Sequence, residues 1–138
     1  NMPLVFFDRV VEGVNASKVI VDDEQGAYEA TQHLIEQGYK RIAHLAGPQN
    51  LIISQNRLNG YKAAIADNKY MIDDRIIKTC GLGTYEEAEQ ITNDLLDSKL
   101  PPDAIFANND VAAYGAMTAI KKRKMKILKI PGSMISLK

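Results

Sequence analysis

The run VIVDDEQGAYEATQHLIEQGYKRIAHLAG, residues 19–47, constrains the fold more than any other part of this 138-residue chain. It opens on the apolar triplet at residues 19–21, which is typical of a short strand. Asp22 and Asp23 follow, and a short carboxylate at this place can accept the free N–H groups of a first helical turn. Small or apolar residues then recur at the three-and-four spacing of one helix face, at Ala27, Ala30, Thr31, Leu34 and Ile35.

The second half of the same run predicts the end of this helix and a strand after it. Gly38 follows the last periodic residue, where a helix end favours a residue that can take a positive φ. A second apolar segment at residues 42–46 is ended by Gly47 and Pro48. Strand, helix and strand within about 30 residues predict a β-α-β crossover with parallel pairing and a right-handed connection.

The rest of the chain continues the alternation of strands and helices. Thr84, with Glu87 three residues later, is a capping box that marks a helix start. Residues 10–18 are expected to form a loop. We predict an α/β fold, an open doubly wound parallel sheet with helices on both faces. The further strands are expected at residues 4–7, 75–79, 104–107 and 133–137, and the further helices at about residues 54–68, 84–96 and 111–122.

The composition is that of one ordinary globular domain, with 46% hydrophobic and 25% charged residues. The formal net charge is zero, so the chain carries no overall electrostatic signature of nucleic-acid or anionic-membrane binding. No apolar run approaches the roughly 20 residues that span a bilayer. The single cysteine, Cys80, excludes an internal disulfide and fits a reducing compartment, so we expect a cytoplasmic protein.

Several polar residues are expected to meet where the strands end. Ligands of open parallel sheets bind at the carboxyl ends of the strands, where helix N-termini and loops converge. Asp8 follows the first strand, Asn109 and Asp110 follow the strand at residues 104–107, and Arg57 lies early in its helix. A guanidinium and carboxylates at one edge suit a polyhydroxylated ligand, because they hold neighbouring hydroxyls as paired donors and acceptors.

Each of these four residues also has a purely structural interpretation. Asp8 can cap a turn. Arg57 can form a surface salt bridge. Asn109 and Asp110 are typical helix N-cap residues. The residue types alone leave both interpretations open.

The motifs of several enzyme and cofactor classes are missing. The Gly-Leu-Gly at residues 81–83 has Glu86 where a dinucleotide loop needs its third glycine, so we expect no nucleotide cofactor. His33 and His44 lack partners at metal-ligand spacing, and both are interpreted as structural. Cys80 has no base near it in sequence, and no Gly-x-Ser-x-Gly turn occurs. We therefore expect no cofactor, no metal and no enzymatic activity.

Four segments in the same order resemble the lactose-repressor family of bacterial transcription regulators. They are PLVFFDR at residues 3–9, VDDEQGAYEATQHLIEQGYKRIAHLAGP at 21–48, NRLNGYKAAI at 56–65 and AIFANNDVAAYGAMTAIKK at 104–122. The resemblance covers the chain up to about Lys126. It implies a periplasmic-binding-protein-like subdomain that binds a small-molecule effector, with Asp8, Arg57, Asn109 and Asp110 lining the cleft.

The resemblance also implies a homodimer. The helix at residues 111–122 has apolar or small residues at nearly every early position, so the face turned away from the sheet is left apolar and predicts an interface. Family members dimerise partly through this helix, and we expect Tyr114 in the contact.

The chain departs from the family at two places. Leu51, Ile53, Leu82 and Gly83 stand where family members often carry polar, acidic or aromatic residues. Lys124 stands where they generally have a glycine. The first four residues leave two alternatives open: the effector is less polar or smaller than a typical sugar, or another subdomain completes the pocket.

These features together predict part of a longer regulator. Residues 1–18 would be an end strand and linker from another subdomain, and residues 19–138 the effector-binding subdomain. DNA would be bound only through a domain outside this chain. The alternative is a periplasmic solute-binding protein of a sugar importer, which shares the fold; an upstream helix-turn-helix would favour the regulator and a signal peptide the importer.

Overall fold

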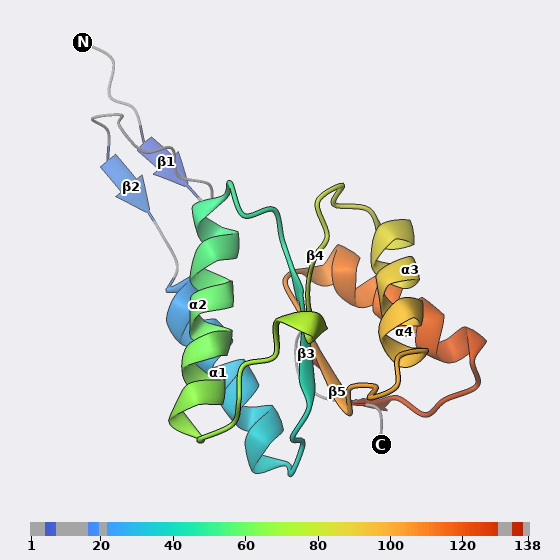
Figure 1. Ribbon diagram of the computed structural model, residues 1–138. Helices are drawn as coiled ribbons and strands as arrows, with labels where there is room; N and C mark the ends of the chain where they lie inside the picture. Colours follow the sequence, from blue (N-terminus) through green and yellow to red (C-terminus); the bar gives the residue numbers. More distant parts are fainter. Residues whose placement is uncertain (1–4, 8–16, 20–21, 130–133, 137–138) are drawn as a thin grey trace.

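The computed structural model describes residues 5–7, 17–19, 22–129 and 134–136 (Figure 1). None of the helices in this part of the chain is long and apolar enough to cross a membrane. The elements in chain order are β1 (Val5–Phe7), β2 (Ser17–Val19), α1 (Asp23–Glu36), β3 (Ile42–Ala46), α2 (Ile52–Asp67), the 3-10 helix η1 (Asp74–Ile76), β4 (Ile77–Thr79), α3 (Tyr85–Leu96), β5 (Ala104–Ala107), α4 (Asp110–Lys122), β6 (Leu128–Lys129) and β7 (Met134–Ser136).

A five-stranded sheet forms the middle layer, in the strand order β4-β3-β5-β7-β6. β3 lies between β4 and β5 and pairs with both in parallel. α1 and α2 pack together against one face, and α3 and α4 pack together against the other (Figure 1). The predicted open α/β sheet with helices on both faces is confirmed.

The two faces of the sheet are apolar because alternate residues of a strand point to opposite sides. In β3, Ala43 and Leu45 join the core under α3 and α4, whereas Ile42 joins the core under α1 and α2. In β5, Ile105 and Phe106 divide in the same way. Every residue of β3 and β5 is buried, as expected for strands covered on both faces.

The β-α-β crossover predicted through α1 is wrong in its first strand. β2 ends at Val19, where the predicted strand began, and takes two residues from the predicted loop. It pairs in parallel with β1 in a separate two-stranded sheet, while β3 pairs with β4 and β5. An apolar triplet identifies an extended segment, but contacts far away in sequence decide which strand it joins. Two crossovers do form among the described residues, from β3 through α2 to β4 and from β4 through α3 to β5.

The C-terminal strands also differ from the fully parallel sheet that was predicted. β7 lies within the predicted range but pairs antiparallel with β5. β6, which was not predicted, pairs antiparallel with β7. The sheet is therefore mixed, and its parallel part is β4-β3-β5.

Local signals set the helix ends as predicted. The side chains of Asp22, Thr84 and Asn109 accept hydrogen bonds from the third residue beyond each of them, at 3.0, 3.3 and 2.9 Å. Gly38 takes a φ of 94° just after α1. Lys124 takes a φ of 57° after α4, which is a strained conformation for a residue with a side chain, costing roughly 1 kcal/mol.

Candidate functional site

Arg57 lies in the second turn of α2 and joins three elements at the carboxyl edge of the sheet. Its Nε and Nη2 lie 2.9 and 2.8 Å from Oδ1 of Asp23, the first residue of α1. Its Nη1 donates to the backbone carbonyl of Asn108, just beyond β5. The salt-bridge interpretation of Arg57 is thus confirmed, and the guanidinium is held in one place. We call this edge, formed by Arg57 and residues 108–110, the lip.

Asn109 and Asp110 complete the lip at the start of α4. The side-chain oxygen of Asn109 accepts the N–H of Ala112, so its capping interpretation is confirmed, while the amide N–H groups are left for other partners. Asp110 is the first residue of α4, where its negative charge suits the helix dipole. Both side chains are exposed. The structure brings Arg57 and the Asn109–Asp110 pair to one edge, and Asp8 lies outside the described residues.

Buried polar atoms lie beside the lip. Oδ1 of Asn108 and Oγ of Ser54 are buried without a hydrogen-bond partner in the described part of the chain. Gly47 lets them approach, because a methyl group there would overlap Oγ of Ser54 and lie 2.5 Å from Nδ2 of Asn108. Buried polar atoms without a partner are uncommon in folded proteins and are groups that a ligand or water can satisfy. The strand-end positions of Gly47 and Asn108 are sequence signals for this cluster, whereas nothing in the sequence points to Ser54.

His44 lies further back in β3 and is fully buried. Its ring stacks between Tyr61 and Phe106, with centroids 5.0 and 4.8 Å apart, and its Nδ1 lies 2.9 Å from the carbonyl oxygen of Phe106. Burial lowers the pKa of His44 to about 4, and the positive charge of Arg57 adds to that effect against the opposing hydrogen bond to Phe106. A neutral, enclosed imidazole supports the structural interpretation.

On the other side of the lip, Glu87 holds the loop before α3. Its two carboxylate oxygens accept the backbone N–H groups of Gly81 and Leu82 at 3.0 and 2.9 Å. The predicted capping box is therefore half formed, because Thr84 caps the N–H of Glu87 while the carboxylate turns to the loop. Cys80 is buried, and burial with the nearby Glu87 charge raises its pKa to about 11, which makes it a poor nucleophile.

A small hollow of about 20 Å³ lies among these groups. It opens between the ends of β3 and β5 and the starts of α3 and α4. Within the described residues no group of three or more His, Cys, Asp or Glu side chains is placed to hold a metal ion. The residues lining the hollow are Ala46, Gly47, Pro48, Cys80, Gly83, Thr84, Asn108, Asn109, Val111 and Ala112.

Tyr114 lies one turn along α4 from Asp110, and its side chain is 60% exposed. Its ring meets the ring of Tyr85 edge-on, with centroids 5.4 Å apart. Val111 and Leu82 are further exposed apolar side chains on the same two segments. Tyr114 is thus on the surface, where the predicted dimer contact requires it.

An open α/β sheet that gathers a fixed arginine and buried polar atoms at its carboxyl edge is the architecture of a ligand-binding domain. The family model described as periplasmic binding proteins and sugar binding domain of LacI family matches residues 1–137, so the chain belongs to this family. The resemblance seen in the sequence is confirmed.

Individual relatives agree with the family match. The chain is 33% identical over 125 residues to the HTH-type transcriptional repressor CytR of Escherichia coli K12, covering 91% of the chain and 36% of the relative. It is 35% identical over 119 residues to the ribose operon repressor of Halalkalibacterium halodurans, covering 86% of the chain and 34% of the relative. The chain therefore spans about a third of the length of these relatives.

Solved structures give the same fold. A regulatory protein of LacI family from Chloroflexus aggregans superposes with a TM-score of 0.80 at 35% identity, over 88% of this chain and 43% of that chain. The transcriptional regulator CelR in a complex with cellobiose superposes with a TM-score of 0.78 at 31% identity, over 89% of this chain and 38% of that chain.

Proposed function

We propose that this chain is the effector-binding and dimerisation part of a cytoplasmic bacterial transcription regulator, not an enzyme, and that its effector is a sugar or related metabolite. The observation that carries the proposal is the lip, where Arg57 is fixed between Asp23 and the Asn108 carbonyl. The CytR and ribose operon relatives are repressors, and CelR was solved with cellobiose, which supports a polyhydroxylated effector.

The chemistry of the lip suits hydroxyl groups. Three of the five guanidinium N–H groups of Arg57 are used within the described residues, which leaves two that can donate to a ligand. The amide of Asn109 can donate as well, and the Asp110 carboxylate supplies acceptors. Asp8 belongs to the proposed site through the family resemblance alone. An effector held between this lip and a second subdomain would change their relative orientation, and a dimer would pass that change to a DNA-binding domain.

The first test is a thermal-shift screen of the full-length protein against sugars, nucleosides and amino acids. We expect a polyhydroxylated compound to raise the unfolding midpoint, and Arg57→Ala to weaken its binding by about tenfold or more, since a charge-assisted hydrogen bond is lost. Arg57→Ala also breaks an ion pair, so each variant is compared with its own ligand-free midpoint. Arg123→Ala is the matched control, because it breaks the exposed pair with Asp97 at the far end of α4 and should leave binding unchanged.

Two outcomes contradict the proposal. Wild-type affinity in Arg57→Ala would remove the lip from the site. A longer form of the protein that binds the same compound but fails to shift DNA from its own upstream region at low salt would favour the importer alternative over a regulator.

The second test concerns the dimer. We expect the full-length protein to sediment as a dimer, and Tyr114→Arg to weaken its self-association by about a hundredfold, because a charge is placed in an apolar contact centred on Tyr114 and Tyr85. Met71→Arg, at a position 92% exposed after α2, is the control and should not change the sedimentation. A full-length wild-type protein that stays monomeric across the micromolar range contradicts this prediction.

A further inference from the structure

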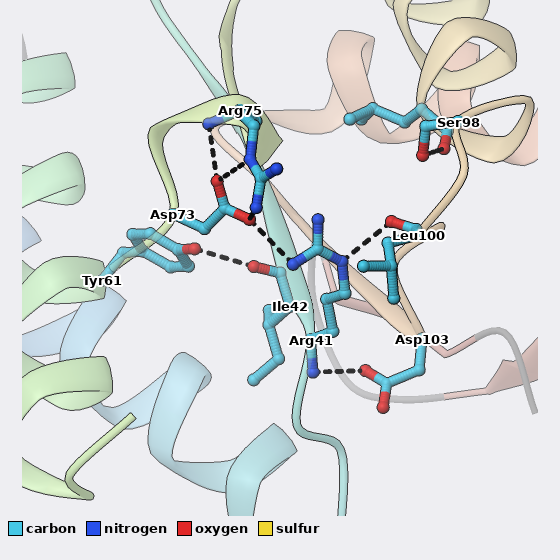
Figure 2. A network of polar contacts seen from close by, with 9 residues as sticks. Arg41, Ile42, Tyr61, Asp73, Arg75, Ser98, Leu100 and Asp103 are labelled. Carbon is cyan, nitrogen blue, oxygen red and sulfur yellow. Dashed lines mark hydrogen bonds and ion pairs between the residues drawn. The ribbon is translucent and has the colours of Figure 1, made fainter. Parts of the chain in front are cut away.

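A second hollow, of about 340 Å³, lies at the opposite edge of the sheet from the lip. Its walls come from Arg41 just before β3, from η1 and β4, and from the end of α3 with the loop that follows (Figure 2). These segments all lie at the amino ends of the parallel strands. The hollow is therefore separate from the proposed effector site.

Arg41 is fixed at the centre of this region. Its Nη1 donates to Oδ2 of Asp73 at 2.8 Å, and its Nε donates to the carbonyl oxygen of Leu100 at 2.8 Å. Its backbone N–H donates to the carboxylate of Asp103 at 3.0 Å. In Figure 2 the third guanidinium nitrogen of Arg41 carries no dashed line and lies on the side of Arg75. The structure thus holds the guanidinium in place and leaves one end of it unused by the described residues.

The carboxylate of Asp73 accepts hydrogen bonds from the guanidinium groups of both Arg41 and Arg75. Arg75 donates to Asp73 through Nε at 2.8 Å and Nη2 at 3.0 Å, while Arg41 donates to the same carboxylate. The two arginines hold the pKa of Asp73 well below its usual range, Arg75 having the larger effect. Asp73 therefore stays charged, and it neutralises only one of its two partners.

Lys78 and Lys99 add two further cations to the lining. Neither lysine side chain has a hydrogen-bond or ion-pair partner among the residues that the structure describes. Asp94 is the only carboxylate among the described lining residues, and it accepts a hydrogen bond from Gln90. Counting four cations against Asp94 and the two carboxylates bonded to Arg41, Asp73 and Asp103, the hollow has a formal excess of one positive charge.

We propose that this hollow binds a small metabolite carrying a phosphate group. A fixed guanidinium matches the geometry of phosphate oxygens, and two unpaired lysines supply the charge that a dianion needs. The volume is at the lower end of the range of about 300–1,000 Å³ typical of small-molecule sites, which suits a phosphorylated metabolite rather than a macromolecule. The aliphatic stems of the lysines and the side chains of Ile76 and Leu95 give the carbon part of such a ligand an apolar wall.

The proposal is tested by isothermal titration of the chain with glycerol 3-phosphate, inorganic phosphate and glycerol. We expect saturable binding of the two phosphate compounds and none of glycerol. The double variant Lys78→Gln/Lys99→Gln should weaken the binding by about tenfold or more, because two charge-assisted contacts are lost. Both lysines are exposed, so the variant should keep the wild-type urea midpoint.

The matched control is Lys121→Gln/Lys126→Gln, which removes the same charge from exposed lysines outside the hollow. It should bind within about twofold of wild type, since only long-range charge is changed. Equal losses in the two double variants would show that phosphate responds to overall charge, and the proposal would fail. Binding of glycerol, or no saturable binding of either phosphate compound, would overturn it as well.

Discussion

Gly115→Ala should lower the free energy of unfolding by about 2 kcal/mol or more, because α4 approaches the backbone of α3 closely at this residue. A methyl group built on Gly115 would overlap the carbonyl oxygen of Tyr85 and lie 2.7 Å from Cβ of Ala88 and 2.9 Å from the backbone nitrogen of Glu89. Two of these three atoms are helix backbone and cannot move aside by changing rotamer. The two helices must separate, and the core beneath them loses contacts.

The matched control is Gly26→Ala in α1. A methyl group there meets nothing within 4 Å, so the substitution should stabilise the chain by up to about 1 kcal/mol through helix propensity alone. The same chemical change is thus expected to have opposite signs at two helix positions. Urea unfolding followed by circular dichroism measures both. A Gly115→Ala variant as stable as Gly26→Ala would show that α3 and α4 do not approach so closely.

Acid should destabilise the fold in a window set by His44. Its pKa is about 4 in the folded chain and 6.5 in the absence of the fold, so between these values the unfolded chain binds a proton that the folded chain does not. Stability from His44 is fully present above pH 6.5 and falls as the pH drops toward 4. The loss over this window is about 3 kcal/mol, because the fold lowers the pKa of His44 from 6.5 to about 4.

Urea unfolding at several pH values measures this loss. His44→Phe should flatten the stability profile between pH 6.5 and 4. Asp73 contributes little to the loss between pH 6.5 and 4, because its lowered pKa changes stability mainly below its usual value of 3.8. If His44→Phe does not fold, an NMR titration of the His44 ring in the wild type replaces it. A titration midpoint near pH 6.5 would contradict a buried, neutral ring.

Local chemistry explains which features the sequence predicted. The caps at Asp22, Thr84 and Asn109 depend on a side chain and a backbone N–H three residues away, so sequence spacing is enough to find them. The strand at residues 104–107 matches β5 throughout, because it is short, apolar and bounded by loop residues. Strand pairing is harder to predict from the sequence. The partner of β2 and the direction of β7 depend on contacts between distant segments, and both were predicted wrongly.

At the lip too, some features follow from the sequence and others depend on contacts between distant residues. Topology alone placed Arg57 and residues 109–110 at one edge, since the carboxyl ends of parallel strands lie together. The partner of Arg57 was missed, because Asp23 is 34 residues away and had a sufficient local role as a capping residue. Glu87 was assigned to a capping box by its spacing, but its carboxylate turned to Gly81 and Leu82. The ligand roles of Asp8, Arg57, Asn109 and Asp110 remain predictions.

The carboxylate of Glu87 has a consequence for how fast the lip and the adjacent loop at residues 81–82 can bind a ligand. The backbone N–H groups of Gly81 and Leu82 are already held by Glu87, so this loop does not have to become ordered when a ligand binds. Little conformational entropy is therefore lost there on association. Encounter rates at this edge should then be governed by diffusion and by the opening of any neighbouring subdomain, rather than by ordering of residues 81–82.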